Sequence, residues 1–304
     1  MKATPAQTLR TVRDFLRFAV SSFNRAELTY GHGTTNAYDE AAYLVLEGLS
    51  LPIDQLEPFL DARLLPDETE RLAGLIEARV KTRKPLPYLL NKAYMHGVPF
   101  YVDERVIVPR SYIGELLALP SFAGGDDALI PEPDSVETIL DLCTGSGCLA
   151  VLSAMRFENA GIDATDLSRD ALDVAAINLA KHGMADRISL KQGNLFAPLN
   201  GRRYDLILAN PPYVAEMEVE AFSAEHAAEP RMAHVSGNDG FDLVRQILAE
   251  APAHLTETGL LVCEFGTGSE ILEAEYPHLP FNFLDTEESE GEVFALSAED
   301  FARA

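Results

Sequence analysis

The residues best suited to chemistry form a tetrapeptide with two consecutive prolines, Asn210-Pro211-Pro212-Tyr213. It follows an apolar run over residues 204–209 that has the composition of a buried strand. Neither proline has an N–H to donate, so the strand must end there and leave a stiff backbone. The Asn210 side chain and the carbonyl of Pro211 can then act as hydrogen-bond acceptors. Such a corner is suited to holding an NH2 group. The alternative interpretation is that these four residues are only a loop that contains two prolines.

A second feature is a tight turn over residues 143–148, between an expected strand at 138–142 and a helix from Leu149. Gly145 and Gly147 would let a ligand approach the backbone closely, beside a helix N-terminus. The pattern is G-x-G and has no third glycine at the dinucleotide spacing. It therefore fits the pyrophosphate site of a Rossmann dinucleotide domain poorly.

Polar residues also follow the next two expected strands. Asp166 ends the strand at 161–165, about 20 positions past the glycines, where a carboxylate can bind ribose hydroxyls. It also lies just before Ser168, a good helix N-cap, so capping offers a second explanation. After the strand at 188–192, Asn194 could bond to an adenine edge and Leu195 could cover the ring.

These segments must be brought together by the elements between them. Strands alternate with helices from about Val136 onward, which predicts a doubly wound parallel sheet. The first and fourth strands of such a sheet are neighbours at its switch point. We therefore expect the glycine turn and Asn210 to lie at the same edge of the sheet.

The N-terminal third reads as helical. Apolar residues recur at helical spacing over 9–23, a second helix is expected near 39–49, and a third from Asp67, where Glu70 would complete a capping box. Two β-rich runs between 98 and 110 surround Asp103-Glu104 and predict a hairpin between domains. We expect a helical domain at 1–92, a hairpin linker at 93–112 and a catalytic domain at 113–304.

Two polar residues outside these motifs have simple structural explanations. His32 lies in a glycine-flanked loop, where a role in the turn is favoured over a functional one. Arg110 follows Pro109 at the exit of the linker. For Arg110, a salt bridge to an acidic neighbour is favoured over a place at the mouth of an active site.

The bulk composition limits the possible partners. The 304 residues carry a net charge of −24, and residues 1–95 contain 12 basic and 12 acidic residues, so the charge lies in the remainder. Such a surface repels phosphate backbones and attracts basic partners. The three cysteines and seven histidines show no metal or disulfide spacing. With no signal peptide or membrane-spanning run, we expect a cytoplasmic protein without a metal or membrane partner.

The motifs in this order resemble those of class I S-adenosylmethionine-dependent methyltransferases with an N-P-P-Y motif, and within them the HemK-type protein-glutamine methyltransferases. The resemblance covers nearly the whole chain and extends to residues 229–231, 236–240 and 260–264. It implies a Rossmann-like seven-stranded methyltransferase sheet with a small N-terminal helical domain that recognises substrate. It also implies an S-adenosylmethionine site made of Asp141, Cys143, Gly145, Gly147, Asp166, Asn194, Leu195 and Asn210.

The branch of the family is indicated by the residues after the linker. Release-factor enzymes of this type read Pro-Arg-Pro-Glu there, whereas this chain reads Pro109-Arg110-Ser111-Tyr112. That segment, the loop at 30–34 and the turn at 143–148 resemble the branch that methylates large-subunit ribosomal protein three. Ribosomal proteins are basic, which agrees with the acidic charge. Methylation of release factors is the alternative.

The resemblance implies a mechanism of positioning rather than of strong base catalysis, because the methyl donor is already a good electrophile. Asn210 and Pro211 would accept the two hydrogens of a glutamine amide, and Tyr213 would stack on it. Two other readings remain: an adenine amino methyltransferase, which would need a basic surface, and a binding module or NAD-dependent enzyme on the same fold.

Overall fold

The computed structural model describes residues 4–125, 127–287 and 289–303. The chain forms two compact units. The first combines residues 1–93 with 102–104 and 222–229, and the second contains the remaining residues. No helix among the described residues is long and apolar enough to cross a membrane.

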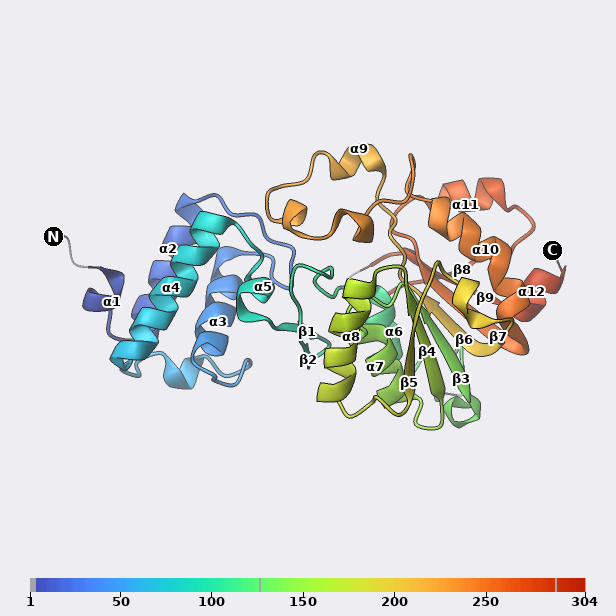
Figure 1. Cartoon of the computed structure of the whole chain (residues 1–304), viewed down its shortest axis with the longest axis horizontal. Coiled ribbons are helices and arrows are strands. Elements are labelled where there is room, and N and C mark those ends of the chain that lie inside the picture. The colour runs from blue at the N-terminus through green and yellow to red at the C-terminus, as the bar shows by residue number, and fades with distance from the viewer. Residues whose placement is uncertain (1–3, 126, 288, 304) are drawn as a thin grey trace. The chain divides into compact units, whose positions relative to one another are not determined.

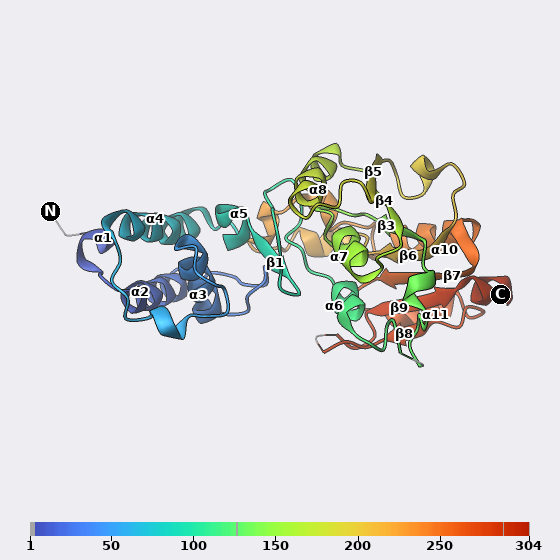
Figure 2. The same ribbon diagram turned by 90° about the horizontal axis from the view of Figure 1, so that it is seen from below.

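The first unit is built on the helices α1 (Pro5–Thr8), α2 (Val12–Arg25), α3 (Ala37–Gly48), α4 (Pro66–Thr82) and α5 (Leu86–Leu90). Figure 2 shows α2, α3 and α4 packed side by side. The helical periodicity predicted from the sequence is confirmed, and α2 buries Phe15, Ala19 and Phe23 on one stripe. Its start is fixed by a capping box, in which the Asp14 amide donates to Thr11 Oγ1 and the Thr11 amide donates to the Asp14 carboxylate.

The expected cap of α4 is wrong. The helix begins at Pro66, whose fixed φ suits the first helical position and whose missing N–H costs nothing there. Glu68, rather than Glu70, reaches back and accepts a hydrogen bond from the Leu65 amide at 2.8 Å. The proline therefore determines which carboxylate caps the helix, and this residue lies two positions before the Glu70 that a start at Asp67 implied.

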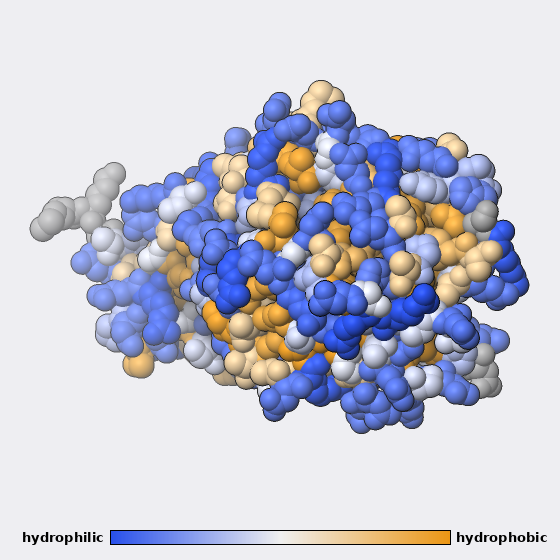
Figure 3. Space-filling view, turned by 45° about the vertical axis from the view of Figure 1, so that its right-hand side comes forward, coloured by the Kyte–Doolittle hydropathy of each residue, from blue (hydrophilic) through white to orange (hydrophobic). Residues whose placement is uncertain are grey.

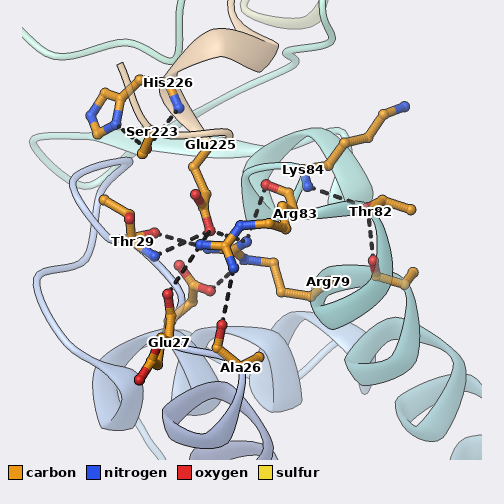
Figure 4. A network of polar contacts seen from close by, with 12 residues as sticks. Ala26, Glu27, Thr29, Arg79, Thr82, Arg83, Lys84, Ser223, Glu225 and His226 are labelled. Atoms are coloured by element: carbon orange, nitrogen blue, oxygen red, sulfur yellow. Dashed lines mark hydrogen bonds and ion pairs between the residues drawn. The ribbon is translucent and has the colours of Figure 1, made fainter. Parts of the chain in front are cut away.

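A network of buried charges links α3, α4 and the segment 222–229 (Figure 4). Arg79 is fully buried, and its Nε donates to Glu40 Oε1 at 2.7 Å while its Nη1 lies 3.5 Å from Glu225 Oε1. Arg83 lies 2.8 Å from the same Glu225 oxygen, which also accepts from the Thr29 amide. Residues that come after the Asn210 tetrapeptide in sequence are thus part of the helical unit.

His32 is part of the same unit. It is buried, its ring centroid lies 4.5 Å from that of His226, and its Nε2 lies 3.6 Å from a Glu229 oxygen. The glycine-flanked loop therefore packs against the segment 222–229.

The hairpin exists, but its position was predicted incorrectly. The strands are β1 (Ala93–Met95) and β2 (Val98–Phe100), and the turn is His96-Gly97 rather than Asp103-Glu104. Both turn residues have positive φ, 47° and 79°, which is the backbone of a type I′ turn that matches strand twist. Residues 101–108 form no strand.

The second unit contains a seven-stranded mixed sheet in the order β5-β4-β3-β6-β7-β9-β8, in which β9 runs antiparallel to β7 and β8. This confirms the fold class expected from the sequence. The strands are β3 (Thr138–Leu142), β4 (Gly161–Asp166), β5 (Ile188–Gln192), β6 (Tyr204–Ala209), β7 (Leu255–Glu264), β8 (Asn282–Leu284) and β9 (Val293–Ser297).

Helices cover both faces of this sheet (Figure 1). One face packs against α6 (Tyr112–Ala118), α7 (Cys148–Arg156) and α8 (Arg169–Lys181), and the other against α10 (Asp242–His254), α11 (Ser269–Glu275) and α12 (Ala298–Arg303). A short helix, α9 (Glu216–Val219), follows the tetrapeptide. Each face carries its own apolar cluster, so the central strands are buried on both sides and read as continuous apolar runs.

The register places the chemically interesting residues at one edge. Strand β3 pairs in parallel with both β4 and β6, and Leu142 lies opposite Thr165 on one side and Ala209 on the other. The residues that follow these three positions are Cys143, Asp166 and Asn210. The expected neighbourhood of the first and fourth strands is therefore confirmed.

Candidate functional site

The glycine turn is fixed by the two strands beside it. The Gly145 amide donates to Asp166 Oδ2 at 2.9 Å, and the other oxygen of that carboxylate accepts from the Ser168 amide at 2.8 Å. Burial is the main cause that raises the pKa of Asp166, and these backbone donors oppose it. Asp166 thus anchors the turn and the segment before α8, while Ser168 caps that helix through the Ala171 amide. The binding of ribose hydroxyls by Asp166 stays a prediction.

The two glycines of the turn have different surroundings. A Cβ at Gly145 would have only the Cys143 carbonyl within reach, at 4.0 Å, so this backbone is open to a ligand. A Cβ at Gly147 would lie 3.2 Å from the Ala175 Cβ, and φ at Gly147 is 81°. Gly145 is thus suited to ligand approach, whereas Gly147 allows the turn to pack closely on α8.

Asp141 is buried beneath the turn. Its Oδ2 accepts from Thr144 Oγ1 at 2.5 Å and from the Ala150 amide at 3.1 Å. Burial raises the pKa of Asp141 to about 7. These contacts make Asp141 the support of the turn and of the first turn of α7. Cys143, the residue that leaves the strand, is half-buried with a φ of 58°, so it also shapes the turn.

The residues after β5 are divided between surface and core. Asn194 is exposed, whereas Leu195 is only 3 % exposed and belongs to the apolar cluster on the α10 face. The exposed apolar side chain next to Asp166 is Leu167, at 58 %. Sequence reasoning passed over Leu167, although an apolar residue just before a helix cap is the signal that could have identified it.

The tetrapeptide has one side chain fixed at each end. Asn210 Nδ2 donates to the Arg110 carbonyl at 3.2 Å, and the Tyr213 hydroxyl donates to Glu264 Oε1 at 3.1 Å. Among the residues that the structure describes, none donates a hydrogen bond to Asn210 Oδ1 or to the Pro211 carbonyl. The two acceptors expected from the sequence therefore remain available.

Tyr213 is held on several sides. A Cβ at Gly266 would lie 2.8 Å from its ring, and a Cβ at Gly240, where φ is 86°, would lie 2.3 Å from its carbonyl oxygen. Burial and the nearby Glu264 carboxylate raise the pKa of Tyr213, so the phenol is neutral and can donate. Sequence reasoning did not assign a role to Glu264, although a carboxylate that ends an apolar strand is itself a signal.

Arg110 contributes its backbone to the site. Its carbonyl holds Asn210, and its guanidinium donates to the Val108 carbonyl at 3.2 Å. The expected salt bridge of Arg110 stays a prediction.

A glycine turn with an acidic partner lies at the carboxyl edge of a seven-stranded sheet, next to a rigid corner whose two acceptors are available, and this is the arrangement of a methyltransferase. Residues 127–229 match the "Methyltransferase small domain" family. Among solved structures, the human Mettl16 catalytic domain in complex with the MAT2A 3′UTR hairpin 6 aligns with a TM-score of 0.50 over 76 % of this chain and 80 % of that one. At 13 % identity, this likeness shows the fold alone.

Closer relatives are found among curated sequences. The ribosomal protein uL3 glutamine methyltransferase of Bradyrhizobium diazoefficiens is 54 % identical over 96 % of this chain and 92 % of its own length. The enzyme of the same name from Burkholderia pseudomallei is 49 % identical over 98 % of this chain and 97 % of its own. This chain belongs to the HemK-type protein-glutamine methyltransferases, in the branch of these uL3 enzymes, and the resemblance seen in the sequence is confirmed.

The site fits the S-adenosylmethionine that this family uses. The open backbone at Gly145, the Asp166 carboxylate and the exposed Leu167 lie together at the ends of β3 and β4. They offer a close backbone approach, a partner for hydroxyl groups and an apolar surface, which suit the parts of a nucleoside.

Proposed function

We propose that this protein transfers a methyl group from S-adenosylmethionine to the side-chain amide nitrogen of a glutamine in large-subunit ribosomal protein uL3. The observation that carries the proposal is the fixed orientation of Asn210. Because its Nδ2 is held by the Arg110 carbonyl, its Oδ1 is left available as an acceptor, one residue before the Pro211 carbonyl. The named activity of relatives at 49–54 % identity over nearly the full length supports the choice of substrate.

The roles of the residues follow from the chemistry of an amide. When bound, the cofactor supplies a methyl group on a sulfonium, which is already an excellent electrophile. The amide nitrogen is a poor nucleophile because its lone pair is delocalised. Asn210 Oδ1 and the Pro211 carbonyl accept its two hydrogens, which orients the nitrogen and stabilises the positive charge that grows on it.

Tyr213 forms the wall of the amide slot and stacks on the planar amide. Gly145, Asp166 and Asn194 contact the cofactor, and Asn210 faces it from β6. The shape of the glycine turn, which the cofactor meets, is set by Asp141, Cys143 and Gly147. Leu195 lies in the apolar core and supports this edge of the sheet. Leu167 provides an exposed apolar surface for the base.

The acidic charge supports a basic protein as the substrate. The net charge of −24 lies outside residues 1–95, and hydrophilic side chains cover much of the face seen in Figure 3. Such a surface attracts a ribosomal protein and repels nucleic acid. The three free cysteines agree with a reducing compartment, and we propose the cytoplasm as the location.

We also propose that the helical domain at 1–92 recognises the substrate and that residues 93–112 link it to the catalytic domain at 113–304. The catalytic residues all come from the later part of the chain, which leaves the helices for recognition. A photo-crosslinking residue at Tyr38, which is 50 % exposed on α3, should crosslink to uL3. Crosslinks to uL3 from positions in the sheet unit alone would contradict this role.

The test of the function is a methylation assay with purified uL3, the release factors, DNA and RNA, using S-adenosylmethionine with a tritiated methyl group. We expect a gain of one methyl group on a single glutamine of uL3, located by mass spectrometry. Methylation of the release factors instead would move the enzyme to the other branch. Label in adenine of nucleic acid, with none in protein, would refute the proposal, and tight binding of NAD without S-adenosylmethionine binding would refute the enzyme class.

A further inference from the structure

Glu264 is an unusually buried carboxylate beside the reactive tetrapeptide. It ends β7 and is only 1 % exposed. Its Oε1 accepts from the Tyr213 hydroxyl at 3.1 Å, and its Oε2 accepts from Ser111 Oγ at 2.7 Å and the Tyr112 amide at 3.0 Å. A buried carboxylate is costly unless several donors satisfy it, and these three donors hold Glu264 in one fixed position.

The segment that satisfies Glu264 also holds the other end of the tetrapeptide. Ser111 is the N-cap of α6, and its hydroxyl accepts from the Ile113 amide at 3.2 Å while donating to Glu264. The residue before it, Arg110, accepts from Asn210 Nδ2. One short stretch at the start of α6 therefore fixes Asn210 directly and Tyr213 through Glu264.

The hydrogen bond from the Tyr213 hydroxyl to Glu264 restrains the Tyr213 ring, which is also packed along one edge. Gly266, two residues past Glu264, lies so close to the Tyr213 ring that a Cβ there would come within 2.8 Å of Cδ2. With that edge packed and the hydroxyl anchored, the plane of the ring is fixed. A ring that must lie flat on an amide needs this restraint, since a small misplacement of reacting groups costs much of the rate.

We propose that Glu264, with Ser111, is a positioning residue for methyl transfer, which acts through the Tyr213 hydroxyl to hold the ring in the plane that receives the glutamine amide. The inference rests on the proposed function, because it assumes that Tyr213 faces the amide. In this proposal Glu264 acts through the Tyr213 hydroxyl and not on the reacting atoms.

The ionisation of Glu264 provides one readout. Burial raises its pKa to about 7, and hydrogen bonds from Ser111 and Tyr213 oppose the rise. The titratable groups next to it are Tyr213, which donates to it, and Cys263, which precedes it on β7, while Arg110 and Tyr112 act on Tyr213. A protonated carboxyl presents a donor in place of an acceptor, so turnover should fall as the pH drops below about 7.

The test is a double-mutant cycle of Glu264→Gln and Tyr213→Phe, measured as kcat on uL3. We expect Glu264→Gln to lower kcat about 10- to 100-fold while the dissociation constant for S-adenosylmethionine stays within a factor of about two. The acidic limb of its pH profile should be lost. The double variant should be no slower than Tyr213→Phe alone, since the effect passes through the hydroxyl.

Ser111→Ala removes one donor and leaves the carboxylate in place, so it should give a smaller loss of kcat. Glu299→Gln is the control, because Glu299 is exposed on α12 and paired with Arg303, and it should leave kcat unchanged. Effects of Glu264→Gln and Tyr213→Phe that multiply, or an unchanged kcat in Glu264→Gln, would overturn the inference.

A second readout does not require substrate. In protein labelled with 13C-tyrosine, the Tyr213 ring signal, assigned by its loss in Tyr213→Phe, should shift in Glu264→Gln. An unshifted signal would overturn the inference even if the activity changed. If wild-type protein methylates no uL3, the proposed function fails, whereas an active wild type with an unaffected Glu264→Gln variant refutes this inference alone.

Discussion

The buried charge network of the helical unit leads to a quantitative prediction about stability. Arg79 is fully buried and binds four oxygens: Glu40 Oε1, Glu225 Oε1 and the carbonyls of Thr29 and Arg83 (Figure 4). Replacing it with methionine keeps most of the volume and removes the charge. Two buried carboxylates, Glu40 and Glu225, then lose a cation.

The magnitude follows from the cost of breaking a buried ion pair by removing one partner, which is about 3–5 kcal/mol. We expect Arg79→Met to reach this range, because within the described part of the chain Glu40 then keeps the Thr34 hydroxyl as its hydrogen-bond donor, whereas Glu225 keeps Arg83. The matched control is Arg13→Met. Arg13 pairs with Asp61 on the surface, where the side chains are 57 % and 85 % exposed, so the control should unfold like the wild type.

The loss should depend on pH in a defined direction. Burial raises the pKa of Glu40, and Arg79 opposes that rise, so removing Arg79 must raise the pKa further. The folded variant then binds more protons than the unfolded chain at mildly acidic pH. Its free energy of unfolding therefore falls as the pH rises, and the deficit against wild type should be smaller at pH 5 than at pH 8.

Hydrogen exchange measured by mass spectrometry is the suitable assay, because two compact units need not unfold together. Faster exchange should appear in α2, α3, α4 and residues 222–229, and far less in β3 and β6. If Arg79→Met exchanged no faster than Arg13→Met at pH 8, the network would not stabilise this unit and the reasoning would be wrong.

Three further predictions concern the site. Asn210→Ala should lower kcat on uL3 about 100- to 1000-fold with little change in cofactor affinity; an unchanged kcat would exclude Asn210 from holding the amide. Asp166→Asn should weaken S-adenosylmethionine binding about tenfold by calorimetry, since one charge-assisted hydrogen bond is lost. Unaltered binding would show that Asp166 only supports the glycine turn and does not bind the cofactor. Gly147→Ala should lower the free energy of unfolding by more than about 1 kcal/mol, because of its positive φ and its contact with Ala175. The control is Gly183→Ala. Gly183 has a φ of 67°, but a Cβ there would have no neighbouring atom within 4 Å, so this variant measures the backbone cost alone and should lower the free energy of unfolding by less.

The sheet could be predicted from the sequence because its strands are buried on both faces. Runs such as 138–142 and 204–209 carry few polar residues, and the residues that end them are conspicuous against that background. The parallel topology then determines which ends meet. Asn210, Gly145 and Asp166 could be assigned to one edge for this reason, and the structure brings them there.

The hairpin and the cap of α4 were predicted incorrectly because, at each place, two local sequence patterns favoured different structures. Val98 to Val108 is rich in β-branched residues, but the positive φ values of His96 and Gly97 place the turn earlier than composition suggests. In α4, Pro66 sets the first turn and makes Glu68 the capping residue. Both errors concern turn and cap chemistry, in which one residue overrides the average of its neighbours.

The contacts made by Glu225 and Glu264 could not have been predicted. Glu225 meets Arg79 across 146 positions of sequence, and Glu264 meets Ser111 across 153. Nothing in the local pattern around either carboxylate indicates its partner. The position of Glu264 at the end of an apolar strand marks it as unusual, but its partner appears only in the tertiary structure.

The long reach of Glu225 has a consequence for biogenesis. The helical unit is not complete when the ribosome has made its last N-terminal helix, because residues 222–229 belong to it and are synthesised after β6. Until then, Arg79 lacks the carboxylate of Glu225 in its buried setting. The first third of the chain therefore remains partly assembled until a segment that follows β6 is made, and a recombinant fragment ending at residue 93 would lack that segment.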